Sequence, residues 1–304
     1  MSGRAVLVTG GSRGIGAAIA RAFAANGDRV AIHHRDNAGL ASDVRDSLPG
    51  DGHVVVQADL ADPAAVRLMV DAAAAGLGGL DVLVNNAGVY QAHPVTEVSY
   101  ADWQQAWQQT LDVNLLGPAN AIWCAVRHMI PAGGGRIVNV SSRGAFRGEP
   151  RNPAYGASKA GLNALGQSLA IPLAQHGIAV ATVAPGFVET DMAADLLASP
   201  EGESIKAQSP FNRVAAPEEI ASAVLWLASP EAEWASGAIL DLNGASYLRL
   251  SDGQHEADVH DGNLGGRHLV KHPVTVETQP PEGRATERGA GPRPWIAREQ
   301  RYRA

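Results

Sequence analysis

Residues 5–16 read AVLVTGGSRGIG, a short apolar run that passes directly into a glycine-rich turn. Gly10, Gly14 and Gly16 have the spacing G-x-x-x-G-x-G, and an Ala-rich stretch with a helical pattern follows. Glycine lets the backbone turn sharply and approach a pyrophosphate, while a helix N-terminus supplies N–H donors and a positive dipole end. The order strand, turn, helix therefore predicts a dinucleotide site, with an ordinary Gly-rich turn as the alternative.

Short apolar runs recur over the first 250 residues and alternate with Ala-rich stretches of helical length. The early runs are continuously apolar, which is typical of parallel strands covered on both faces. We therefore predict a single α/β domain, a Rossmann-like doubly wound parallel sheet. The predicted strands are residues 5–9, 29–33, 54–57, 82–85, 136–140, 179–183 and 239–242, with helices between them, for example at 14–26, 63–75, 155–176 and 217–228.

Composition changes near Leu250, so we place the folded domain at residues 1–250. Residues 251–304 contain many charged residues, Gly and Pro, but few large apolar side chains. Because such a segment can bury little apolar surface, the sequence predicts a polar C-terminal tail that is disordered or forms an extended arm.

The properties of the whole chain exclude several classes of function. A formal net charge of −7 argues against a nucleic-acid partner, which needs a basic face. The single cysteine excludes an internal disulfide, and without a Cys/His zinc spacing no metal site is predicted. No apolar run is long enough to span a bilayer and the N-terminus shows no signal peptide, so a cytoplasmic protein without a membrane partner is expected.

Three polar residues have the spacing of a proton-transfer site. Tyr155 and Lys159 are four residues apart on a predicted helix and share one face, and Ser142 follows a predicted strand end, where open α/β sheets place ligands. Hydride transfer to a carbonyl leaves charge on its oxygen, which must be stabilised and protonated. A free tyrosine has a pKa of about 10, and a neighbouring ammonium is expected to lower it. Lysine occurs elsewhere only at Lys206 and Lys271, which favours a titratable amine over a surface charge.

The residues at the end of the second predicted strand and just after it bear on cofactor choice. The sequence there reads Ile32, His33, His34, Arg35, without the acidic residue that often holds a ribose 2′-hydroxyl in NAD sites. Arg35 here and Arg13 in the glycine turn suit a 2′-phosphate, because guanidinium pairs with phosphate. We therefore predict that NADP(H) is favoured and NAD(H) is possible; two solvated arginines are the alternative interpretation.

Taken together, these motifs resemble the short-chain dehydrogenase/reductase family over roughly residues 3–249. The matching stretches are residues 9–16, 59–60, 85–88, 114, 142, 155–159 and 185–190. The resemblance implies that Tyr155 is the general acid/base, that Lys159 binds the nicotinamide ribose and lowers the tyrosine pKa, and that Ser142 orients the carbonyl. It also implies that Asn114 holds a water molecule that relays protons.

The glycine turn, the second strand and the resemblance together give a set of cofactor-binding residues. They are Gly10, Ser12, Arg13, Gly14, Ile15, Gly16, His34, Arg35, Asp59, Leu60, Asn86, Ala87, Gly88, Tyr155, Lys159, Pro185, Gly186, Val188 and Thr190. The family is independent of metals and often tetrameric, so a homo-oligomer (a tetramer or dimer) is expected. By the same resemblance, residues 192–212 form a mobile substrate lid. Tyr90 and His93 follow the Asn-Ala-Gly turn, so they either face the substrate pocket or lie on a surface loop.

The leading hypothesis is an oxidoreductase that transfers a hydride between NADP(H) and a small-molecule carbonyl or alcohol. A 3-oxoacyl-acyl-carrier-protein reductase is the alternative among enzymes. Ile171 stands where such reductases carry a basic residue, and its absence weakens the carrier-protein interpretation. Arg127 could match a second basic position. A catalytically silent dinucleotide-sensing protein is the alternative of another class, and the intact Ser, Tyr, Lys and Asn set argues against it.

Overall fold

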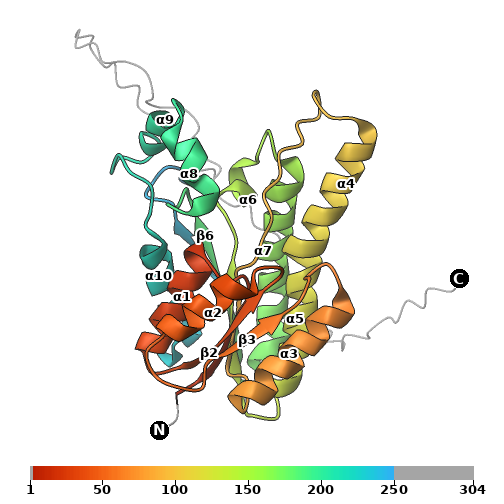
Figure 1. Cartoon of the computed structure of the whole chain (residues 1–304), viewed down its shortest axis with the longest axis vertical. Helices are drawn as coiled ribbons and strands as arrows, with labels where there is room; N and C mark the ends of the chain where they lie inside the picture. The colour runs from red at the N-terminus through yellow and green to blue at the C-terminus, as the bar shows by residue number, and fades with distance from the viewer. Residues whose placement is uncertain (1–2, 250–304) are drawn as a thin grey trace, which may run out of the picture. The chain divides into compact units, whose positions relative to one another are not determined.

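A seven-stranded parallel sheet lies between two layers of helices in the computed structural model, which describes residues 3–249 except for the side chains of Asp191, Met192 and Asp195 (Figure 1). The strand order is β3-β2-β1-β4-β5-β6-β7. The strands are β1 (Ala5–Val8), β2 (Arg29–His34), β3 (Val54–Gln57), β4 (Val82–Asn85), β5 (Gly135–Val140), β6 (Ile178–Pro185) and β7 (Ile239–Leu242). The order reverses between β1 and β4, as in a doubly wound fold, and the predicted fold class is confirmed.

The two faces of the sheet bury separate cores because successive side chains along a strand point to opposite faces. Leu7 packs with helices α3 (Pro63–Leu77), α5 (Gly117–Met129) and α7 (Pro153–Ala174). Val6 and Val8, its neighbours on β1, pack with α1 (Gly14–Ala25), α2 (Ala38–Ser47) and α10 (Pro217–Leu227) on the opposite face. Burial on both faces explains why the strands read as continuous apolar runs.

The remaining helical segments are shorter or interrupted. They are α4 (Tyr100–Leu111), the π-helical turn η1 (Asp112–Leu116), α6 (Gly144–Arg147), α8 (Asp191–Ala198), α9 (Gly202–Lys206) and the 3-10 turn η2 (Pro230–Ala235). In Figure 1, α8, α9 and α6 lie at the same end of the domain. The segment at residues 192–212, predicted as a lid loop, therefore contains helical turns in α8 and α9.

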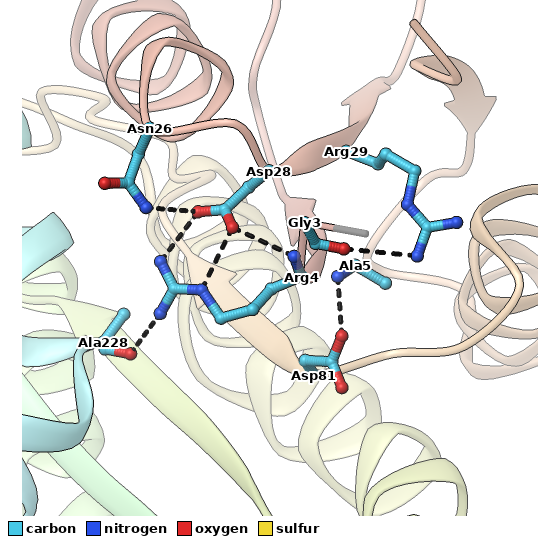
Figure 2. Close-up of polar contacts among 8 residues, drawn as sticks. All are labelled: Gly3, Arg4, Ala5, Asn26, Asp28, Arg29, Asp81 and Ala228. Atoms are coloured by element: carbon cyan, nitrogen blue, oxygen red, sulfur yellow. Dashed lines mark hydrogen bonds and ion pairs between the residues drawn. The ribbon is translucent and has the colours of Figure 1, made fainter. Parts of the chain in front are cut away.

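An ion-pair network joins the amino end of β1 to β2 and α10 (Figure 2). The Arg4 guanidinium donates two hydrogen bonds to the Asp28 carboxylate, at 3.1 and 2.7 Å, and a third to the Ala228 carbonyl at 2.6 Å. The backbone N–H of Arg4 also donates to Asp28, whose side chain is only 3% exposed. On the adjacent residue, the Ala5 N–H donates to the Asp81 carboxylate at 2.7 Å. These bonds fix where the first strand enters the sheet.

Across residues 3–249, no helix combines the length and apolar character needed to cross a membrane. The predicted tail, residues 251–304, lies outside the described residues, so its disordered or extended state remains a prediction.

Candidate functional site

The glycine turn after β1 has the backbone geometry that its sequence predicts. Gly10 and Gly14 adopt φ angles of +63° and +52°, in the left-handed region that favours glycine. A Cβ atom on Gly16 would lie 2.1 Å from the Gly10 carbonyl oxygen, so only glycine fits there. Helix α1 begins at Gly14 and has no acidic residue in its first turn. The start of α1 therefore presents a positive helix end, with N–H groups that have no partner inside the helix, to whatever lies beside it.

A buried histidine that sequence reasoning missed holds this turn in place. The Gly10 N–H donates to His33 Nδ1 at 2.9 Å, and His33 Nε2 donates to the Ala58 carbonyl at 3.1 Å. The ring is therefore the neutral tautomer with its proton on Nε2. Burial lowers the pKa of His33 to about 4, because a charged imidazole would lose its hydration. His33 reads as an ordinary strand residue, so only the tertiary contact identifies its role.

A cavity of about 490 Å³ opens beside the glycine turn and continues to Tyr155. Every residue predicted to contact the cofactor lines it, and so do Ser142, Tyr155 and Lys159. Asn86 supports the wall, because its Nδ2 donates to the Thr9 carbonyl at 2.9 Å. The structure thus brings together residues from loops that follow several strands, as expected at the carboxyl edge of an open parallel sheet.

Asn114 is the one predicted site residue that does not line this cavity. It lies fully buried in η1, where its Oδ1 accepts from the Val89 N–H at 2.8 Å and its Nδ2 donates to the Val89 carbonyl at 2.9 Å. A Cβ atom on Gly88 would be 3.3 Å from Asn114 Oδ1 and 3.6 Å from Lys159 Nζ. Asn114 is therefore close to Lys159, and its role in a proton relay remains a prediction.

The expected direction of the Tyr155 pKa shift is wrong for this structure. Burial is the main cause that raises the pKa of Tyr155 to about 12; the nearby Glu149 carboxylate acts in the same direction, and the adjacent Ser142 hydroxyl opposes the shift only partly. Burial also lowers the pKa of Lys159 to about 8. Lys159 Nζ donates to the Val140 carbonyl at 2.8 Å and lies 5.7 Å from the centre of the Tyr155 ring. At neutral pH, the phenol and the ammonium both carry their protons.

Helix α7, which carries Tyr155 and Lys159, is capped from a distant loop. Its N-cap residue, Asn152, makes no side-chain cap hydrogen bond. Instead, the Ala154 N–H donates to His93 Nε2 at 3.1 Å, and His93 Nδ1 donates to the Gln91 carbonyl at 2.8 Å. His93 is 1% exposed and does not line the cavity, so neither sequence interpretation of it was right. It satisfies a helix N–H next to Tyr155.

Tyr90 and Glu149 enclose the other side of Tyr155. The Tyr90 and Tyr155 rings pack edge to face with their centres 4.8 Å apart. The Tyr90 hydroxyl donates to Glu149 Oε2 at 3.4 Å, and burial together with the Glu149 charge raises the Tyr90 pKa to about 12. Tyr90 is half-exposed and lines the cavity, which agrees with the pocket-facing interpretation of this residue.

Known proteins resemble this chain over most of its length. A family model described as enoyl-(acyl carrier protein) reductase matches residues 10–244. The chain is 41% identical over 244 residues to a cis-4-hydroxycyclohexanecarboxylate dehydrogenase of Sinomonas cyclohexanicum, covering 79% of this chain and 95% of that one. It is 38% identical over 251 residues to a D-threitol dehydrogenase of Mycolicibacterium smegmatis, covering 82% and 95%.

A solved structure matches as well. It is a short chain dehydrogenase from Burkholderia cenocepacia in complex with NADP, with a TM-score of 0.72 and 35% sequence identity. The match covers 81% of this chain and 98% of that one.

Proposed function

This chain belongs to the short-chain dehydrogenase/reductase family of oxidoreductases, and we propose that it transfers a hydride between NADP(H) and a carbonyl or alcohol substrate. The observation that carries the proposal is the single cavity that runs from the glycine turn to Ser142, Tyr155 and Lys159. A dinucleotide lying on the turn would extend toward these three residues, which are the ones suited to handle the substrate oxygen and its proton.

The described residues fit a dinucleotide. A Cβ atom at Gly16 would collide with the Gly10 carbonyl, so glycine is what lets the turn pack closely on the start of α1 beside the cavity. His34 lines the cavity, and its buried Nδ1 has no hydrogen-bond partner within the described part of the chain. When bound, the nicotinamide supplies or accepts the hydride. The residues of this chain supply the rest: binding, orientation and proton transfer.

Each of the three polar residues has a distinct proposed task. In the reducing direction, the Ser142 hydroxyl holds the carbonyl oxygen and the Tyr155 hydroxyl donates a proton to it. A pKa of about 12 keeps Tyr155 protonated at neutral pH, ready to donate. Lys159, close to the same ring, then stabilises the tyrosinate through its ammonium charge. In the oxidising direction Tyr155 first loses its proton to solvent, and the resulting tyrosinate accepts the proton of the alcohol.

We propose NADP(H) as the preferred cofactor because Arg13 and Arg35 both line the cavity, and a guanidinium pairs well with a 2′-phosphate. Arg35 is exposed, and its Nε donates to the Asp36 carboxylate. Replacing Arg35 by Ala should raise the KM for NADP(H) much more than the KM for NAD(H). Equal changes for both cofactors, or a wild-type preference for NAD(H), would contradict the assignment.

The proposed activity is tested by incubating the full-length chain with NADP⁺ and a panel of alcohols, and following NADPH absorbance. The panel should contain cis-4-hydroxycyclohexanecarboxylate and D-threitol, the substrates that the two relatives' names give, and the neutral alcohol cyclohexanol. NADPH formation with any of them supports the proposal. A protein that binds NADP⁺ tightly and oxidises none of a broad panel would be a silent sensor instead.

We also propose that the chain forms a homo-oligomer. Leu116, Trp123 and Ile130, on or beside α5, are 51%, 55% and 37% exposed, and a group of exposed large apolar side chains is a candidate subunit contact. Size-exclusion chromatography with light scattering would show a dimer or tetramer; a monomer at micromolar concentration would contradict this proposal.

A further inference from the structure

Arg143 follows Ser142 directly and is one of the residues that line the same cavity. The residue is 3% exposed. Its backbone N–H donates to the Pro185 carbonyl at 2.8 Å, which ties it to the end of β6. A charged side chain in this position is close to the reacting centre and is largely removed from bulk water.

The partners of the Arg143 guanidinium are neutral. One terminal nitrogen, Nη1, donates to Ser246 Oγ, and the other, Nη2, donates to Gln208 Oε1 at 2.6 Å. The guanidinium also stacks on Phe187, at 4.9 Å from the ring centre. Among the side chains that the structure describes, no carboxylate forms an ion pair with it, and its Nε makes no hydrogen bond to them.

Two other charges face the Arg143 guanidinium. Glu149 also lines the cavity, and its negative charge attracts the Arg143 guanidinium. Its carboxylate is already engaged elsewhere: Oε1 lies 3.8 Å from Arg147 Nε, and Oε2 accepts a hydrogen bond from the Tyr90 hydroxyl. Arg147 repels the Arg143 guanidinium. Burial, together with the repulsion from Arg147, lowers the pKa of Arg143 to about 10 despite the attraction of Glu149, so the guanidinium remains a cation at neutral pH. A buried cation without a counter-ion is unfavourable, and an anion that enters the cavity removes this penalty.

We propose that the substrate carries a carboxylate that binds the Arg143 guanidinium while its alcohol or carbonyl carbon lies at Ser142 and Tyr155. This inference rests on the proposed function and names its substrate class. One arginine matches one carboxylate in charge, whereas a doubly charged phosphate would be repelled more strongly by Glu149, which lines the same cavity.

The test uses a pair of inert probes of equal size, cyclohexanecarboxylate and cyclohexanecarboxamide, titrated into the enzyme–NADP⁺ complex by calorimetry. A hydrogen bond to a charged group contributes roughly 1.5–3 kcal/mol, so the carboxylate should bind about ten- to a hundredfold more tightly than the amide. Arg143→Met should abolish this preference. Arg143→Lys should keep part of it, because an ammonium retains the charge but not the planar geometry.

Arg147→Met is the matched control, since it removes the same charge four residues away at a side chain outside the cavity lining. It should leave the preference unchanged. Equal binding of both probes to wild type, no binding of either, or an Arg143→Met variant that keeps the preference would overturn the proposal. If Arg143→Met weakens the binding of both probes equally, Arg143 has a structural role in joining Gln208 to Ser246. If the variant loses affinity for NADP⁺, Arg143 binds the cofactor. Both outcomes refute a substrate role.

The outcome is separable from that of the proposed function. An enzyme that oxidises cyclohexanol but shows no carboxylate preference refutes only the role of Arg143. An enzyme–NADP⁺ complex that binds the carboxylate through Arg143 but oxidises no alcohol refutes only the proposed oxidoreductase activity.

Discussion

Mild acid should destabilise this protein through one buried side chain, His33. Its Nδ1 accepts the Gly10 N–H and its Nε2 donates to Ala58, so the ring has no free site for a second proton. Protonation would set an N–H against the N–H of Gly10. The glycine turn, and with it the proposed phosphate site, should loosen as the ring becomes charged.

The size and sign of the effect follow from the pKa of His33. Its ordinary value is 6.5 and burial lowers it to about 4 in the folded chain. Between these values the unfolded chain binds a proton that the folded chain does not. The contribution of the neutral His33 ring to the free energy of unfolding is therefore fully present above pH 6.5 and is lost as the pH falls toward 4. At about 1.4 kcal/mol per pH unit, the loss attributable to His33 is roughly 2 to 3 kcal/mol at about pH 4.5.

Urea unfolding at neutral pH and at about pH 4.5 measures this loss in wild type and in the His33→Gln variant. Glutamine can accept one hydrogen bond and donate another but does not titrate. On acidification, the free energy of unfolding of wild type should fall by about 2 to 3 kcal/mol more than that of His33→Gln. The affinity of wild type for NADP⁺ should fall over the same pH range. His176→Gln, at an exposed histidine, is the control and should behave as wild type. Identical pH dependence in wild type and His33→Gln would refute the reasoning.

Three further predictions concern the rest of the framework and the site. His93→Ala should lower kcat about tenfold with little change in KM, because α7 loses its cap, and His93→Gln should restore part of kcat; steady-state kinetics with unchanged kcat in the alanine variant would contradict this. Asp28→Ala should lower the free energy of unfolding by about 2 to 3 kcal/mol, because the Arg4 guanidinium loses its only carboxylate partner among the described residues and keeps only its bond to the Ala228 carbonyl. Urea unfolding checks this, and kcat should stay unchanged. The kcat/KM for ketone reduction should fall as the pH rises through about 8, where Lys159 loses its ammonium charge; a profile that stays flat to high pH would count against this role.

The fold could be predicted because its strands and its first turn depend on local patterns. Buried parallel strands must be apolar on both faces, and a turn that brings Gly16 against the Gly10 carbonyl admits only glycine. The strand ends found in the structure agree with the predicted ones to within a few residues. The spacing of Tyr155 and Lys159 likewise depends only on the helix repeat.

Residues whose role depends on distant contacts could not be predicted in this way. His33 contacts Gly10 and Ala58 across three strands, and His93 caps a helix that begins some sixty residues later in the chain. Arg143 becomes notable only because it is buried beside Ser142. The direction of the Tyr155 pKa shift was mispredicted because spacing reveals that an ammonium is near but not how deeply the phenol is buried.

The central claim is that Tyr155 transfers the proton in an NADP(H)-dependent reaction, and the Tyr155→Phe variant tests it most directly. Phenylalanine keeps the ring that packs on Tyr90 but removes the hydroxyl. On any alcohol that the wild-type enzyme oxidises, kcat should fall by about a hundred- to ten-thousandfold, while the Kd for NADP⁺ changes by less than about threefold. A Tyr155→Phe variant that oxidises the same alcohol at close to the wild-type rate would contradict the account.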